Sequence, residues 1–147
     1  MRTLLCIALV CLASCKAQQP MGETIEGLVL LQQDGYGGTA DFKARAIREQ
    51  KTLDLFYAQI NRTRKPGLPV PTLDFGREMA LMIHLGDQQG EKKVMVSMLS
   101  ETETEMVLAV QIGEGLEDPG SQPILQPFYL YKMPLTEKRV TFKKVDL

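Results

Sequence analysis

The sequence predicts a β-rich α+β domain, in which about six to eight mostly antiparallel strands form a sheet or sandwich beside one amphipathic helix. Two observations predict this class. Residues 74–147 alternate short apolar runs with polar turns, as neighbouring antiparallel strands do. Only the segment at about 52–62 has the helical period. A doubly wound fold needs a helix between most strands, so the helix-free second half excludes it.

The first half of the domain begins with a predicted strand at 24–31 (TIEGLVLL) and a glycine-rich turn at 32–38 (QQDGYGG). The next segment, 39–48, has two interpretations. Its apolar and polar residues alternate, as in a half-buried strand. The same residues have high helix propensity and could extend the following helix backwards. We favour the strand.

The helix at about 52–62 is predicted by its ends and its apolar period. Thr52 is a suitable N-cap, and the basic residues within 62–65 suit the negative end of the helix dipole. Pro66 and Gly67 end the segment. Apolar residues recur at positions i, i+3, i+4 and i+7, which places them on one face: Leu53, Phe56, Tyr57 and Ile60.

Strands without intervening helices are predicted from the helix to the end of the chain. The segment 78–85 (EMALMIHL) is apolar at nearly every position, which is typical of a central strand buried on both faces. Polar turns at 86–90 and 101–105 and a long Gly- and Pro-bearing loop at 113–123 separate the runs. The predicted strands are 78–85, 93–99, 106–112, 127–133 and 139–145.

The N-terminus has the features of a secretory signal peptide at 1–14: a positive start, an apolar run too short to anchor in a bilayer, and small residues at its end. Leu-Ala-Ser before Cys15 resembles the bacterial lipobox. We therefore expect cleavage between Ser14 and Cys15 and lipidation of the Cys15 thiol. Residues 15–23 would then form a lipidated tether, and 24–147 a single β-rich domain.

These features predict a bacterial cell-envelope protein held in a membrane through lipidated Cys15. Lys16 follows the cysteine where an aspartate can mark inner-membrane retention, which favours the outer membrane. Because Cys6 and Cys11 leave with the signal, the mature domain has no free thiol for a disulfide, a thiolate metal site or a nucleophile. The formal net charge of −1, with interspersed signs, argues against a nucleic-acid partner.

Four short motifs follow one another within residues 74–134: Asp74-Phe75, Leu85-Gly86, Gln126-Pro127-Phe128-Tyr129 and Met133-Pro134. Their order resembles the family of PrcB C-terminal domains, and the glycine turn and helix upstream resemble the family's lead-in. PrcB is the lipoprotein accessory subunit of a cell-surface protease complex. The resemblance therefore implies a non-catalytic lipoprotein that binds or steadies another envelope protein, such as a protease. At 86–92 (GDQQGEK) the chain departs from the family, which commonly has a Gly-Gly-Tyr-like turn there.

Candidate catalytic and ligand-binding residues are few. His84 is the only histidine, and without a cysteine or a G-x-S-x-G motif it predicts a half-buried strand residue bonded to a neighbour. Glu101, Glu103 and Glu105 lack the glycine and the spacing of a calcium loop. The turn at 34–38 lacks the lysine and hydroxyl of a phosphate loop. We expect no catalytic residue, no cofactor and no metal site.

Phe128 falls on one face of a predicted strand and Tyr129 with Tyr131 on the other. One face is core, so the two tyrosines are the candidate partner contact. The sequence is compatible with three functions, and each predicts a different surface. A binding module would expose an apolar or tyrosine patch beside Tyr129 and Tyr131. A structural envelope lipoprotein would have a uniformly polar surface. An enzyme would need convergent polar groups around His84 or the turn at 101–105.

Overall fold

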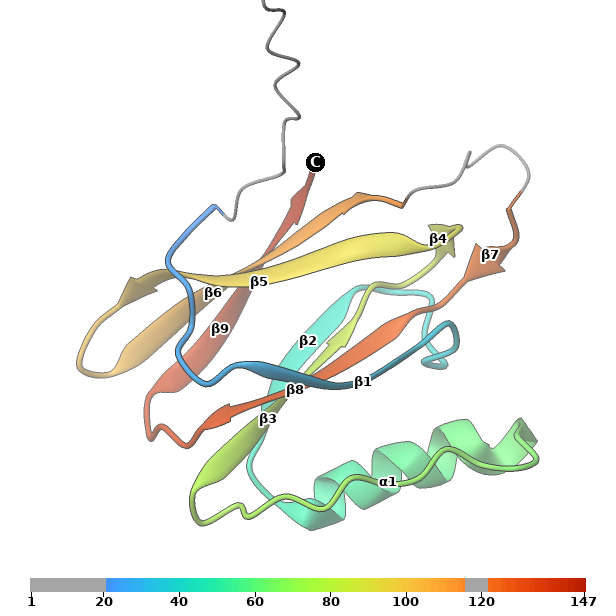
Figure 1. Cartoon of the computed structure of the whole chain (residues 1–147), viewed down its shortest axis with the longest axis horizontal. Helices are drawn as coiled ribbons and strands as arrows, with labels where there is room; N and C mark the ends of the chain where they lie inside the picture. Colours follow the sequence, from blue (N-terminus) through green and yellow to red (C-terminus); the bar gives the residue numbers. More distant parts are fainter. Residues whose placement is uncertain (1–20, 116–121) are drawn as a thin grey trace, which may run out of the picture.

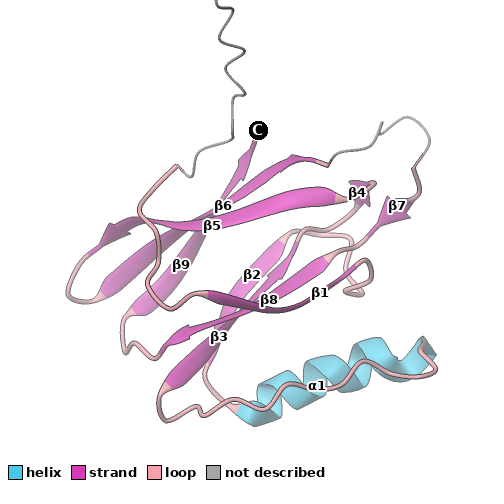
Figure 2. Ribbon diagram, in the orientation of Figure 1, coloured by secondary structure: helices cyan, strands magenta, loops and turns pink. Residues whose placement is uncertain are grey.

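The computed structural model describes residues 21–115 and 122–147, which form three layers (Figure 1). A three-stranded sheet forms one outer layer, a four-stranded sheet the middle layer, and one α-helix the other outer layer (Figure 2). Most strand pairs are antiparallel. The predicted fold class, a β-rich α+β domain with one helix, is confirmed.

The middle sheet has the strand order β1-β8-β3-β2 and is antiparallel throughout. The segment at 39–48 contributes a strand to it, so the favoured interpretation of that segment is confirmed. The register places Lys43 and Phe128 on opposite sides of His84. The strands are β1 (Val29–Asp34), β2 (Lys43–Ile47), β3 (Glu78–His84) and β8 (Phe128–Pro134).

The outer sheet contains the hairpin of β5 (Lys92–Glu101) and β6 (Glu105–Glu114), with β9 (Arg139–Asp146) on the other side of β6. The β6–β9 pair is parallel, whereas we expected antiparallel neighbours joined by short turns. The reason is that the chain leaves β8 in one sheet and enters β9 in the other, so β9 cannot be the hairpin partner of β8.

A two-residue ladder that the sequence did not predict joins two turns. It pairs β4 (Gln88–Gln89) with β7 (Ile124–Leu125). Strands this short contain no alternation that a pattern could detect. The ladder brings the turn after β3 beside the chain that leads into β8.

Two cores lie on the two faces of the middle sheet. Along β3, Met79, Leu81 and Ile83 face the outer sheet, whereas Ala80 and Met82 face the helix. All five are fully buried. The predicted central strand is therefore confirmed, because a helix covers one of its faces and a second sheet covers the other.

Helix α1 (Gln50–Ile60) buries its predicted apolar face against the middle sheet. It begins two residues earlier than predicted, with Glu49 as its N-cap, and a 3₁₀ turn, η1 (Asn61–Thr63), follows it. The expectation that Thr52 caps the helix is wrong. Thr52 lies inside the first turn, and its hydroxyl donates to Glu49 Oε1 at 2.8 Å.

Gly86, the second residue after β3, adopts a conformation that a side chain disfavours. Its φ is +77°, and a Cβ atom there would lie 2.5 Å from the carbonyl oxygen of Ala40. We expect Gly86→Ala to lower the free energy of unfolding by about 3 kcal/mol, since left-handed strain and backbone overlap add. Urea unfolding measures this. Gly35→Ala is the control, because its Cβ would meet only Leu125 methyl groups at 3.7 and 3.8 Å. Equal losses in both variants would contradict the prediction.

Candidate binding surface

The two sheets touch along one side of the sandwich. Arg48, just after β2, donates to the carbonyl oxygen of Lys138 at 2.8 Å. Lys144 of β9 lies over the ring of Phe42, with Nζ 5.8 Å from the ring centroid. The edges formed by β2 and β9 are therefore held together.

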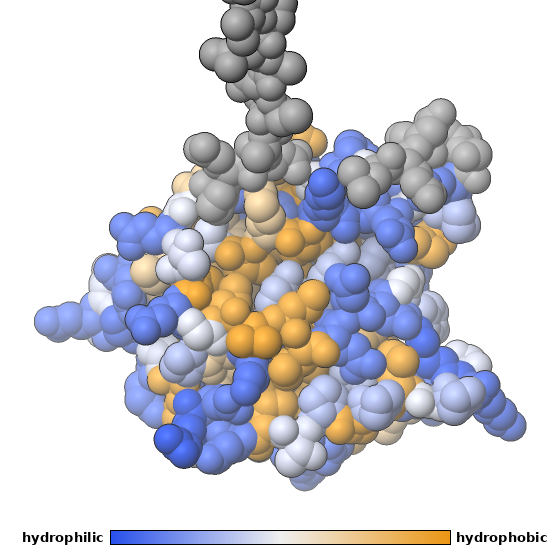
Figure 3. Space-filling view, viewed as in Figure 1, coloured by the Kyte–Doolittle hydropathy of each residue, from blue (hydrophilic) through white to orange (hydrophobic). Residues whose placement is uncertain are grey.

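The opposite side of the sandwich is open. Its edges are β1 of the middle sheet and β5 of the outer sheet, and each lacks a strand partner on its outward side within the described residues. Apolar side chains gather on this side of the molecule (Figure 3). We call it the β1–β5 opening, and its apolar residues are Leu28, Leu30, Val94, Val96 and Met98.

Leu30 is the most exposed of these five residues: 44% of it is accessible, whereas the other four are half-buried. Its neighbour in β1, Val29, is 47% accessible. Leu30 pairs with Tyr131 in the register, so its side chain lies on the face of β1 that turns toward the opening. The sequence alone did not single out Leu30, because it sits within a uniformly apolar run.

One end of the opening is covered by the segment that precedes β1. Glu23 exchanges two backbone hydrogen bonds with Met98 of β5, at 2.8 and 2.9 Å, and Ile25 is buried in the core between the sheets. The chain then crosses to β1. The predicted strand at 24–31 is thus wrong in its bounds: β1 begins at Val29, and the residues before it connect the two sheets.

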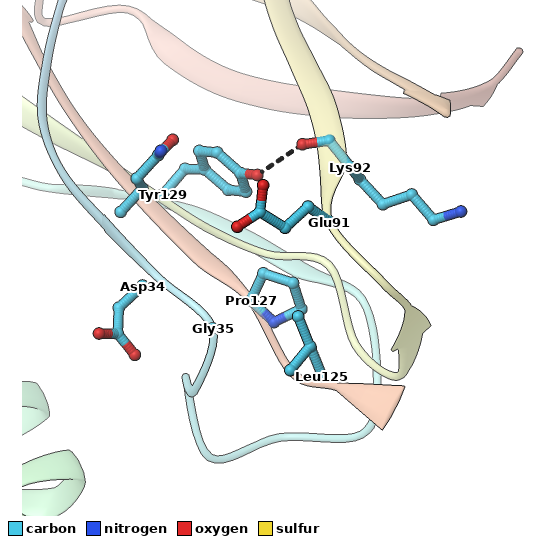
Figure 4. A pocket seen from close by; sticks show the side chains of 8 residues that line it. Asp34, Gly35, Glu91, Lys92, Leu125, Pro127 and Tyr129 are labelled. Carbon is cyan, nitrogen blue, oxygen red and sulfur yellow. Dashed lines mark hydrogen bonds between the residues drawn. The ribbon is translucent and has the colours of Figure 1, made fainter. Parts of the chain in front are cut away.

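A hollow of about 190 Å³ lies at the other end of the opening (Figure 4). Its floor includes Tyr129, Pro127 and Leu125, and the Tyr129 hydroxyl donates to the carbonyl oxygen of Lys92 at 2.9 Å. The side chain of Lys92 points away from the hollow and pairs with Glu114 at 2.6 Å. The hollow therefore offers an apolar floor with a polar rim.

Tyr129 and Tyr131 are core residues, which corrects the expectation of an exposed tyrosine patch. Each is only 8% accessible, and both pack in the core between the sheets. Burial, with the neighbouring Tyr129, raises the pKa of Tyr131 to about 12. The physical reason is that β8 is an inner strand whose two faces are both covered. The apolar surface beside these tyrosines is supplied by β1 and β5 instead.

A second hollow, of about 520 Å³, lies between α1 and β2, and we call it the α1–β2 groove. The side chain of His84 lies in its wall and is 8% accessible, between the rings of Phe56 and Phe128. Its Nδ1 atom is enclosed and has no hydrogen-bond partner among the described residues. The expectation that His84 is bonded to a neighbour is therefore wrong.

The charge on His84 is disfavoured in the fold. Burial is the main cause, and Arg45 and Lys43 beside it add repulsion, so that the pKa of His84 falls from 6.5 to about 4. At neutral pH the imidazole is therefore uncharged. It is a weak base, and no carboxylate lines the groove to orient it.

This pKa predicts a loss of stability in acid. Between pH 6.5 and about 4 the unfolded chain binds a proton at His84 that the folded chain excludes, so stability is full above pH 6.5 and falls as pH drops. We expect the His84 contribution to shrink by about 2–3 kcal/mol between pH 7.5 and 4.5. Urea unfolding of wild type and His84→Gln at both pH values measures it. An equal loss in both proteins would refute the prediction.

The remaining candidates have structural partners. Glu101 pairs with Lys138 at 2.8 Å and Glu105 with Arg139 at 3.2 Å, beside Glu103 in the β5–β6 turn. No cluster of three or more metal-ligating side chains occurs in 21–115 or 122–147. In the glycine turn, Asp34 accepts from the Tyr36 amide at 2.8 Å.

Arg64 is an ion-pair partner rather than a charge at the helix end. Its guanidinium pairs with Asp34 of β1 and lies 5.7 Å from the ring centroid of Tyr36. This contact joins the segment after α1 to β1 and to the glycine turn. Asp34 is the only charged residue in β1, and it is occupied by this pair.

Ser14 and Cys15, the predicted cleavage and lipidation residues, lie outside the described residues. No helix in the described part of the chain is long and apolar enough to cross a membrane. The comparisons give no relative from which a role can be transferred: no known family, no curated protein and no solved structure matches the chain. The resemblance to PrcB domains stays a prediction.

Proposed function

We propose that the chain is a lipoprotein of the bacterial cell envelope, held in a membrane through Cys15, that acts as a non-catalytic binding module for another envelope protein. The observation that carries the proposal is the β1–β5 opening. There, apart from the Glu23–Met98 pair, two edges without a neighbouring strand flank exposed Leu30 and four half-buried apolar side chains. A contiguous apolar patch on a protein surface is typical of a protein-binding site.

The partner that fits this surface is an extended segment of a protein. An unpaired edge offers backbone donors and acceptors to an added strand, while neighbouring apolar side chains receive alternate side chains of that strand. Natural edge strands are usually protected by lysine or proline. β1 (VLLQQD) carries neither, and only a bulge between Leu30 and Gln32 interrupts it. We infer that the rest of this edge is available for pairing.

A catalytic role has weaker support. The α1–β2 groove does bring polar groups near His84, as an enzyme would require. The low pKa of His84 and the lack of a carboxylate or thiol in the groove argue for binding instead. The resemblance to PrcB domains suggests a protease of the envelope as the class of partner to look for first.

Partner capture tests the proposal. The lipidated protein is crosslinked in its native membranes, purified, and its partners are identified by mass spectrometry. We expect one stoichiometric envelope protein, and a drop of about tenfold or more in its recovery with Leu30→Arg, since a central apolar contact contributes about 2 kcal/mol or more.

The matched control is Val70→Arg. Val70 is 39% accessible and lies in the connection between η1 and β3, in neither of the strands that form the opening. It should leave recovery unchanged, and thermal melts should show both variants folded. Recovery of abundant envelope proteins alone, or equal effects of the two variants, would instead support a structural lipoprotein without a specific partner.

A further inference from the structure

The α1–β2 groove carries two positive charges that no ion pair among the described residues neutralises. Lys43 and Arg45 are exposed on the face of β2 that turns toward the helix, and neither has an ion-pair partner among the described residues. No acidic side chain lines the groove. The groove therefore has a local charge of about +2 while His84 is neutral.

His84 adds a hydrogen-bond donor to these cations. Its enclosed Nδ1 atom faces Gly37, where a Cβ atom would lie 2.9 Å away, so no partner can reach it from that side. A buried N–H without a partner is rarer than a buried acceptor without one. We therefore assign the proton of the neutral ring to Nε2, so that Nδ1 is an acceptor without a partner. Nε2 is then the nitrogen that can donate a hydrogen bond to a ligand.

The groove also has an apolar wall. Leu55, on the outward side of α1, is 63% accessible, and Phe56 forms part of the same lining. Cations and an N–H donor beside exposed leucine suit a carboxylate that is flanked by apolar side chains. A free inorganic anion would leave the apolar wall uncovered.

The position of the groove favours a protein over a lipid headgroup. Met21, where the described chain begins, donates its backbone N–H to Gln111 of β6 in the outer sheet, at 2.6 Å. Helix α1 covers the far face of the middle sheet (Figure 1). Both sheets thus separate the groove from the point at which the tether would enter, and the tether leads to the membrane.

We propose that the α1–β2 groove binds an acidic segment of the protein partner, with a carboxylate between Lys43 and Arg45 and an apolar neighbour on Leu55. This inference rests on the proposed binding function and adds a second contact to it. The β1–β5 opening supplies an apolar strand contact, and the groove supplies the selection for negative charge.

The unique histidine makes the test direct. The full lipidated chain, with labelled histidine and in zwitterionic micelles, is titrated with a blocked pentapeptide that alternates leucine and glutamate, and the ring resonances of His84 are followed. We expect a saturable shift and a rise of the His84 pKa from about 4, since a bound carboxylate favours the charged ring. The leucine–glutamine peptide should produce neither effect.

The double variant Lys43→Gln with Arg45→Gln should abolish the shift, whereas Lys93→Gln with Lys143→Gln, two lysines outside the groove, should preserve it. A shift that is equal with both peptides, or that survives the groove variant, would overturn the inference. So would a shift caused by phosphatidylglycerol vesicles or inorganic phosphate but not by the glutamate peptide. The capture experiment with Leu30→Arg tests the proposed function and does not involve the groove. A failure of the peptide titration would therefore overturn this inference alone, and a failure of partner capture would overturn the proposed function.

Discussion

Phe128→Ala is expected to lower the free energy of unfolding by about 3–5 kcal/mol, the usual cost of removing a buried ring. Phe128 is fully buried in the core between the middle sheet and the helix. Its ring contacts Phe56 and Tyr57, with centroids 5.0 and 6.4 Å away, so its loss leaves a cavity between α1 and β8. Urea unfolding of the purified chain measures the change.

Leu55→Ala is the matched control for this prediction. It removes an apolar side chain from α1, the helix that packs on Phe128, but Leu55 is 63% accessible, so the expected change is about 0.5 kcal/mol or less. Comparable losses in the two variants would show that the helix does not pack on β8 through Phe128.

Cys15→Ala is expected to move the protein entirely from the membrane fraction to the soluble fraction. Durable attachment needs two or more acyl chains, and the proposed lipidation supplies them at one thiol. Ile25, the first core residue of the described part of the chain, lies beyond the tether, so the domain should stay folded. Membrane fractionation and labelling with radioactive palmitate measure both effects.

Cys11→Ala is the control for the lipid anchor, because Cys11 lies inside the predicted signal peptide and leaves with it. This variant should incorporate palmitate and pellet with membranes as the wild type does. Palmitate that persists in Cys15→Ala, or a wild-type protein that takes up no label, would place the anchor elsewhere.

Much of the fold follows from local patterns. The apolar period of α1 predicts its buried face, and the near-continuous apolar run at 78–85 predicts a strand covered on both sides. Alternation at 39–48 is enough to favour β2. These predictions succeed because each depends on residues that are close in sequence.

The orientation of the tyrosines could not be taken from alternation alone. Alternation separates Phe128 from Tyr129 and Tyr131 correctly, since they lie in different cores. It does not say whether the second face is open, because that depends on the outer sheet. The run Phe128–Pro134 is apolar at most positions, a signal for an inner strand that could have predicted burial of both faces.

The candidate surfaces depend on contacts between distant segments. Leu28, just before β1, and Val94 of β5 pack against one core only because β1 and β5 are both edges on the same side of the sandwich. Lys43 stands opposite His84 because of the β2–β3 register, across a helix and a long connection. No pattern within either segment contains this information.

The central claim is that the β1–β5 opening receives an extended segment of one envelope protein, and site-specific photocrosslinking in living cells tests it most directly. A photoreactive amino acid replaces Leu30 in one strain and Val70 in another. The account predicts one discrete crosslinked partner from position 30 and none from position 70. No adduct at position 30, or the same mixture of adducts at both positions, would contradict it.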